Sequence, residues 1–169
     1  QQNLVMPDMR AAPRLADFAR LLARCYFKLG EWQVAMNEEW VIDETYDVIL
    51  SYKRATELDR AWYKAWHAWA LANFDVITHH ERRGEAIPFH EVAASIVPSV
   101  QGFFRSIALA SGNSLQDTLR LLTLWFKFGH LEHVADAVRQ GFGTVSVDTW
   151  LGVIPQMIAR ISAPSARVR

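Results

Sequence analysis

The chain has 169 residues, 51% of them hydrophobic, and its 18 basic and 18 acidic side chains give a formal net charge of zero. This balance excludes a global positive field of the kind that gathers DNA or RNA, so no nucleic-acid partner is expected. The single cysteine, Cys25, excludes an internal disulfide, and no apolar run approaches the roughly 20 residues that span a bilayer. We therefore expect a cytoplasmic protein without direct membrane insertion, with the nucleus left open.

The first part of the chain has the spacing of an amphipathic helix. Apolar residues recur at three- and four-residue steps and predict one buried face, made of Phe18, Leu21, Leu22, Cys25, Leu29 and Trp32. As part of that face, Cys25 is expected to be a small buried hydrophobe. Gly30, in the stretch KLGEW, is expected to end the helix in the left-handed conformation, and a second helix is expected over about 32–40, up to Trp40.

The rest of the chain also has helical spacing and almost no alternating strand pattern. Further helices are expected over about 41–58, from RAWYKAWHAW to about 81, and over 89–110, 115–128, 131–140 and 147–160. Pro98 should kink or split the helix that contains it. Ser114 and Asp117 resemble a capping arrangement at the start of the next helix.

Two segments of the chain echo each other. LARCYFKLGEW and LTLWFKFGHLE align on Gly30 and Gly129, and the offset between these glycines is near three times a ~34-residue helix–turn–helix repeat. The sequence therefore predicts an all-α fold, an α-solenoid of TPR-like helical hairpins. In such an array, stacking buries the apolar face that a single hairpin cannot bury alone.

Three tryptophans in RAWYKAWHAW share one side of the predicted helix. Trp62, Trp66 and Trp69 fall within a narrow arc, and an aromatic stripe of this spacing is more often structural core than a ligand platform. Lys64 lies about 200° away from Trp62 on the same helix and is expected to point to the opposite face.

Basic residues form a stripe on the first predicted helix. Arg20, Arg24 and Lys28 step by four residues along the side opposite the apolar face, and a stripe of this kind is usually a solvated surface. If the helices that carry Arg24, Lys28 and Lys64 lie side by side, however, these three cations would converge and suit a polyanion.

Motifs for catalysis and metal binding are absent from the sequence. It contains no GxSxG elbow, Walker-type loop, dinucleotide fingerprint or kinase catalytic loop, so no catalytic residue is predicted. His79 and His80 with His90, or His130 with His133, lack the spacing of a metal site, and no metal is expected.

Long strings of the sequence resemble the FAT region of the TOR (target of rapamycin) serine/threonine protein kinases, members of the phosphatidylinositol 3-kinase-related kinases. They are LARCYFKLGEWQ, ATELDRAWYKAWHAWALANF, VPSVQGFFRSIALASGNSLQDTLRLLTLWFKFGH and VDTWLGVIPQMIARI, and together they span about 21–161. The resemblance implies that residues 1–169 are a partial FAT domain without a kinase domain, cut from a longer protein. Its first repeats would cover about 14–81 and its later repeats about 89–161.

The resemblance also implies a function and a site. The segment would be a non-catalytic scaffold that clamps and regulates the kinase domain of the parent chain. Its partners would be the remaining FAT helices, the subunits of a TOR complex such as TORC1 in nutrient signalling, and a second parent copy. The parent would be recruited to the vacuolar or lysosomal membrane surface.

No cofactor is implied as a requirement, but inositol hexakisphosphate would bind as a structural ligand at Arg24, Lys28 and Lys64. Other basic residues of that pocket lie upstream in the family, so the site in this chain would be incomplete. The alternative is a free-standing TPR-like adaptor that binds a partner peptide.

Overall fold

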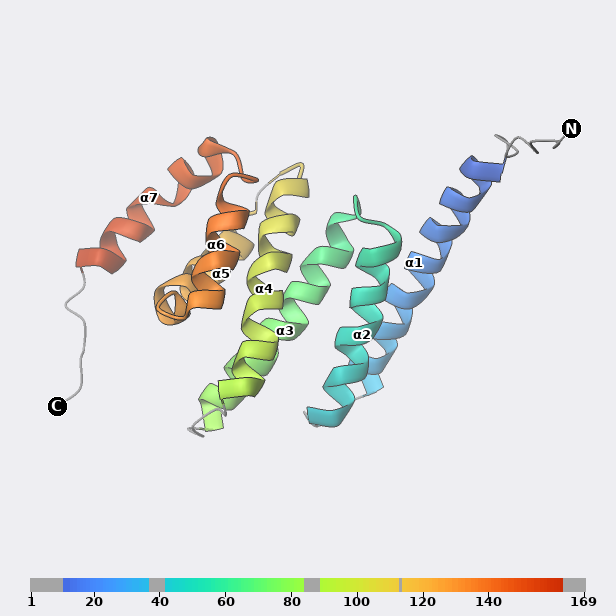
Figure 1. The fold of residues 1–169 in the computed structure, drawn as a ribbon, viewed down its shortest axis with the longest axis horizontal. Coiled ribbons are helices and arrows are strands. Elements are labelled where there is room, and N and C mark those ends of the chain that lie inside the picture. Colours follow the sequence, from blue (N-terminus) through green and yellow to red (C-terminus); the bar gives the residue numbers. More distant parts are fainter. Residues whose placement is uncertain (1–10, 37–41, 84–88, 113, 163–169) are drawn as a thin grey trace, which may run out of the picture.

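The computed structural model describes residues 11–36, 42–83, 89–112 and 114–162, and every regular element within these ranges is an α-helix. The helices are α1 (Ala11–Met36), α2 (Ile42–Leu58), α3 (Tyr63–Arg83), α4 (Phe89–Leu109), α5 (Leu115–Phe128), α6 (Glu132–Phe142) and α7 (Val147–Ser162). They follow one another along the long axis of the molecule, with α1 at one end and α7 at the other (Figure 1). The prediction of an all-α, helical-repeat fold is confirmed.

Neighbouring helices pair, and the pairs stack. The most extensive helix–helix contacts join α1 to α2 and α3 to α4, and α2 packs on α3 so that the second pair lies against the first. Beyond them, α4 contacts both α5 and α6, and α7 lies against α5. Each helix is therefore stabilised mainly by its neighbours in the array, as in a solenoid.

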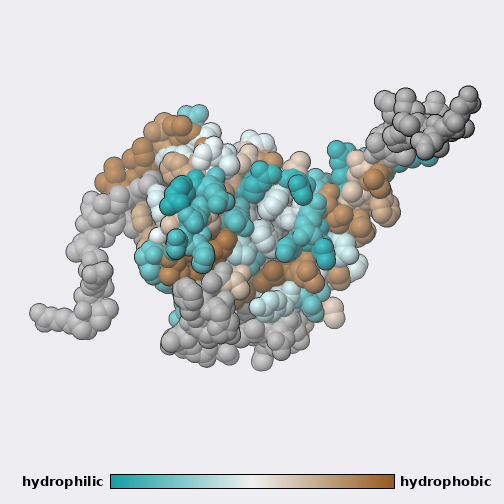
Figure 2. Space-filling view, viewed as in Figure 1, coloured by the Kyte–Doolittle hydropathy of each residue, from teal (hydrophilic) through white to brown (hydrophobic). Residues whose placement is uncertain are grey.

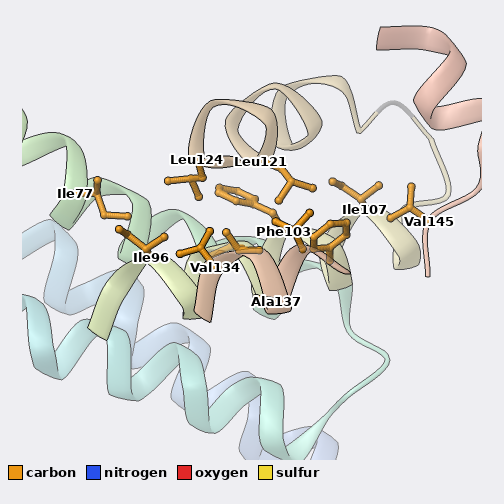
Figure 3. Packing of buried hydrophobic residues seen from close by; sticks show 13 residues of the cluster. Ile77, Ile96, Phe103, Ile107, Leu121, Leu124, Val134, Ala137 and Val145 are labelled. Carbon is orange, nitrogen blue, oxygen red and sulfur yellow. The ribbon is translucent and has the colours of Figure 1, made fainter. Parts of the chain in front are cut away.

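The larger hydrophobic core joins α3, α4, α5 and α6. Phe103 of α4 is fully buried, and its ring meets that of Phe74 of α3 edge to face, 5.9 Å between centroids. Figure 3 shows side chains of four successive helices converging around this ring. The buried members of the cluster are Ala70, Ile77, Ile96, Val100, Phe103, Phe104, Ile107, Leu121, Leu124, Val134, Ala137, Val138 and Val145.

A smaller core lies between the α1–α2 pair and α3. Its buried members are Val48, Tyr52, Trp69 and Ala72. Trp69 is thus a core residue, whereas Trp62 and Trp66 are half-buried. Because α3 begins at Tyr63, Trp62 belongs to the connection before that helix, and the helix-face reasoning that grouped it with the other two tryptophans does not apply to it.

α1 does not end at Gly30. It continues to Met36, so the predicted break at Gly30 and the separate helix over 32–40 are wrong; Trp40 lies outside the described residues. Gly30 is buried against Tyr52 of α2, and a Cβ atom on Gly30 would lie 2.6 Å from Cε1 of that ring. Gly30 therefore serves the close approach of two helices, which sequence alone cannot distinguish from a helix stop.

The predicted buried face of α1 is mostly exposed. Phe18 is 61% exposed, Leu21 62% and Trp32 59%, and Cys25 is exposed too, so the prediction that this face and Cys25 are buried is wrong. α2, the helix with which α1 has its main contacts, packs instead on the face that carries Ala23 and Gly30, where small side chains let the backbones approach.

The start of α5 also differs from its prediction. Ser114 occupies the N-cap position but makes no side-chain cap hydrogen bond, and the carboxylate of Asp117 turns into the core. At the other end of α5, Gly129 is right-handed, with φ of −64°. Gly129 ends its helix whereas Gly30 lies inside one, so the two aligned glycines are not structurally equivalent. Pro98 and Pro155 lie inside α4 and α7, and neither helix is split.

The surface is apolar at both ends of the array. Figure 2 shows hydrophobic surface over α7 and over parts of α1, on either side of a largely hydrophilic centre. On α7 the exposed residues Val147, Leu151, Ile154 and Ile158 follow helical spacing. None of the described helices is both long and apolar enough to cross a membrane.

Candidate functional site

The predicted basic site lies where the connection between α2 and α3 meets α1. Arg24 and Lys28 stand one turn apart on α1, and Lys64 lies in the first turn of α3. Trp62, two residues before Lys64, contacts the ring of Phe27 on α1 at 4.8 Å between centroids. This aromatic contact brings the connection before α3 to the side of α1 that carries Arg24.

Arg24 is held in place by two neighbours. Its guanidinium carbon lies 3.5 Å from the centroid of the Trp62 ring, and Nη1 donates a hydrogen bond of 3.0 Å to Oδ2 of Asp59. The carboxylate of Asp59 is largely buried, while the arginine remains half-exposed. Stacking on a tryptophan and pairing with a carboxylate both reduce the freedom of the guanidinium, so one face of a planar cation is presented to solvent.

Lys28 and Lys64 differ in their surroundings. Lys28 donates a 2.7 Å hydrogen bond from Nζ to Oε2 of Glu31, one turn further along α1, and both side chains are well exposed. Lys64 is exposed and has no ion pair within the part of the chain that the structure describes. Among the residues that the structure describes, Lys64 is therefore the one of these three cations that is not paired with a carboxylate.

The site as a whole is only weakly positive. Asp59 and Glu31 offset two of the three predicted cations, so a polyanion must either displace these carboxylates or find further positive charge. Arg60 is a nearby source of positive charge, because it is exposed and lies in the turn between Asp59 and Trp62. The sequence reasoning missed Arg60, although its position at the start of RAWYKAWHAW was a usable signal.

A second polar cluster is centred on Asp117, and the sequence did not predict it. The Asp117 side chain is 3% exposed, and its Oδ2 accepts hydrogen bonds from Ser106 Oγ at 2.7 Å and His67 Nδ1 at 2.8 Å. Nη1 of Arg120 lies 3.3 Å from Oδ1. Burial alone raises the pKa of Asp117, but the hydrogen bonds of His67 and Ser106 and the charges of His67 and Arg120 outweigh it and lower the pKa.

This cluster joins three helices. His67 belongs to α3, Ser106 to α4, and Asp117 and Arg120 to α5. Ser106 is fully buried, and its Oγ also lies 3.1 Å from the carbonyl oxygen of Phe103, so its hydroxyl is not accessible to a substrate. Among the described residues, no three histidine, cysteine, aspartate or glutamate side chains group as metal ligands do; the side chain of His90 lies outside them.

Comparison with known proteins places most of the chain in one family. The profile of the FAT domain matches residues 2–123. Serine/threonine-protein kinase tor1 of Schizosaccharomyces pombe is 48% identical over 163 residues, which are 96% of this chain and 7% of the kinase. Serine/threonine-protein kinase TOR2 of Saccharomyces cerevisiae is 35% identical over 196 residues, and the match covers 97% of this chain and 8% of the kinase.

The match extends to animals. Serine/threonine-protein kinase mTor of Drosophila melanogaster is 41% identical over 159 residues, which are 84% of this chain and 6% of the kinase. The chain thus spans less than a tenth of the length of each of these three relatives.

Proposed function

Since this chain belongs to the FAT domain family, in the form found in TOR-type serine/threonine-protein kinases, we propose that it is a non-catalytic scaffold segment that clamps and regulates a kinase domain. The observation that carries the proposal is the stacked helical array with an apolar stripe on each end helix. A repeat array is stabilised through its neighbours, so such stripes suit further helices of a longer chain. Through them the segment would join the parent's FAT helices, its kinase domain, the subunits of a TOR complex and a second parent copy.

The second part of the proposal concerns Arg24, Lys28 and Lys64, which would form part of an inositol hexakisphosphate site. The stacking of Arg24 on Trp62 supports it, because a fixed guanidinium suits a phosphate better than a mobile one does. Lys64, which is exposed, adds a second donor. The carboxylates of Asp59 and Glu31 weaken the field, so the complete site needs positive charge from elsewhere in the parent chain, and the ligand would be structural rather than catalytic.

Calorimetric titration of inositol hexakisphosphate into the complete natural polypeptide tests the site. Lys64→Ala should weaken binding by up to about fivefold, the upper end for one exposed charge pair, and the double charge reversal Lys28→Glu with Lys64→Glu should abolish it. Raising the salt concentration should also weaken the binding of inositol hexakisphosphate to the wild type, because salt screens charge pairs.

Lys53→Glu is the matched control for these variants. It reverses an exposed lysine of α2, outside the proposed site, and should leave the affinity unchanged. If the Lys28/Lys64 double variant binds inositol hexakisphosphate with the affinity of the wild type, these residues do not bind a polyanion. A structural ligand should also raise the melting temperature of the wild type, since binding to the folded state alone stabilises by mass action.

The free-standing adaptor is the weaker alternative. A peptide-binding TPR-like module of this size would not need apolar stripes exposed on both α1 and α7, since terminal repeats of independent arrays carry a polar outer face.

A further inference from the structure

A cavity of about 290 Å³ lies between the α1–α2 pair and α3. Its wall is mainly aliphatic and includes Val34 of α1, Val48 of α2 and Leu71 of α3. This volume is at the lower end of the range of ligand pockets, so it suits a small ligand with an apolar body. The cavity shares no lining residue with Arg24, Lys28 and Lys64.

Two polar side chains of α3, His67 and Asp75, interrupt the apolar wall. Nδ1 of His67 is engaged by the buried carboxylate of Asp117 at 2.8 Å, and a carboxylate can only accept, so Nδ1 carries the proton. The ring cannot turn without losing its bond to Asp117. His67 is therefore a fixed part of the cavity wall.

Asp75 offers a negative charge that is not compensated by direct contact. Its side chain is half-buried, and its carboxylate has no hydrogen bond or ion pair within the described part of the chain. Burial raises the pKa of this carboxyl, only partly opposed by the more distant charges of Arg120 and Arg82. A half-buried carboxylate without a direct partner loses part of its hydration, and a bound cation would offset that cost.

We propose that this cavity binds a small primary alkylammonium compound. The ammonium donates charge-assisted hydrogen bonds to the carboxylate of Asp75, and the alkyl chain packs on the aliphatic wall. An anion is disfavoured by Asp75, and a neutral alkyl compound leaves its carboxylate unpaired. The recognised chemistry is therefore a cation with an apolar stem of a few carbons.

The probe for this site is n-hexylammonium chloride, observed by saturation-transfer difference NMR on the complete natural polypeptide. 1-Hexanol and hexanoate, which have the same chain length, are the neutral and anionic comparisons. We expect hexylammonium to bind more tightly than hexanol and hexanoate not to bind. Asp75→Asn, which keeps the shape of the side chain and removes its charge, should weaken hexylammonium binding about tenfold, the effect of losing a charged hydrogen-bond partner.

Asp136→Asn is the matched control, because Asp136 is a partly exposed carboxylate of α6 paired with Arg139 and should not affect the cavity. If Asp75→Asn fails to fold, Val34→Lys replaces it: Val34 is 52% exposed and lines the cavity, so a lysine there should compete for Asp75 and weaken binding. The proposal is overturned if the folded variant binds hexylammonium as the wild type does, or if hexanol binds equally well.

Discussion

At the scale of single residues, Asp117 shows how a charged group is accommodated in the core. The carboxylate is nearly inaccessible to solvent, but Ser106, His67 and Arg120 all lie within hydrogen-bonding or ion-pairing distance. A buried charge is tolerated when its oxygen atoms are satisfied in this way, and removing the charge leaves the surrounding donors without their acceptor. Asp117 thereby links α3, α4 and α5 through one side chain.

Replacing Asp117 by asparagine should lower the free energy of unfolding by about 2 kcal/mol at pH 7, because two charge-assisted contacts are lost. The effect depends on pH. The pKa of Asp117 is lowered in the folded state, so its ionised form contributes stability above the unfolded-state value of about 3.9, and this contribution is lost as the pH falls through the folded-state pKa. Urea unfolding between pH 7 and pH 3, monitored by circular dichroism, measures how the free energy of unfolding of the wild type and of Asp117→Asn depends on pH.

In that titration the gap between the wild type and Asp117→Asn should narrow below about pH 4. Asp136→Asn serves again as the control, since its carboxylate lies at the surface. A gap between wild type and Asp117→Asn that stays constant down to pH 3 would show that the carboxylate's charge is not what stabilises the junction.

At the scale of helices, close approach depends on positions without a side chain. Gly30 of α1 faces the ring of Tyr52 on α2, and Gly102 of α4 faces Ala70 on α3. Both glycines lie inside the helix pairs that have the most extensive contacts. The intrinsic cost of a glycine in a helix, about 1 kcal/mol relative to alanine, is accepted there because it allows tighter packing of the partner helix.

Gly30→Ala should therefore destabilise the chain by about 1–3 kcal/mol, since the added Cβ would lie 2.6 Å from Cε1 of Tyr52 and force α1 and α2 apart. Gly152→Ala is a matched control in the exposed part of α7, where a Cβ would meet no atom within 4 Å. It should stabilise by up to about 1 kcal/mol through helix propensity. Urea unfolding of both variants measures this opposite pair of effects; stabilisation by Gly30→Ala would contradict the packing role.

At the scale of the whole molecule, the array is apolar at its two ends. The outer faces of α1 and α7 expose phenylalanine, tryptophan, leucine and isoleucine side chains at helical spacing, while the core lies between them. Exposed apolar patches of this kind mark surfaces that associate. The arrangement agrees with a segment that packs between further elements of a longer chain.

The 169-residue chain alone should therefore self-associate. Phe18→Lys combined with Leu21→Lys should shift the distribution towards monomer in sedimentation velocity, because two charges interrupt the apolar face of α1. The control pair Gln101→Lys with Gln140→Lys adds the same charge at exposed polar positions and should leave association unchanged. Equal association of both double variants would mean that net charge, not the α1 face, governs it.

The pattern of residues was sufficient to predict the class of fold and most helix positions. Helical spacing is a local property of the backbone, and it predicted α2, α3, α4, α5, α6 and α7 to within a few residues. The long strings around RAWYKAWHAW also indicated the family, because they are specific at the level of the residues themselves. At the candidate site, spacing predicted that Arg24 and Lys28 share one side of a helix, which α1 confirms, but not that Arg24 stacks on Trp62.

Which faces of those helices are buried could be learned only from how the helices pack together. The apolar stripe with Phe18 was expected to be buried, yet α2 packs on the side with Gly30, and Cys25 is left exposed. Asp117 was expected to cap a helix, yet donors from two other helices draw its carboxylate into the core. The physical reason is the same in each case: periodicity records which side chains share a face, whereas burial depends on which other helix packs against that face, and that partner is far away in the sequence.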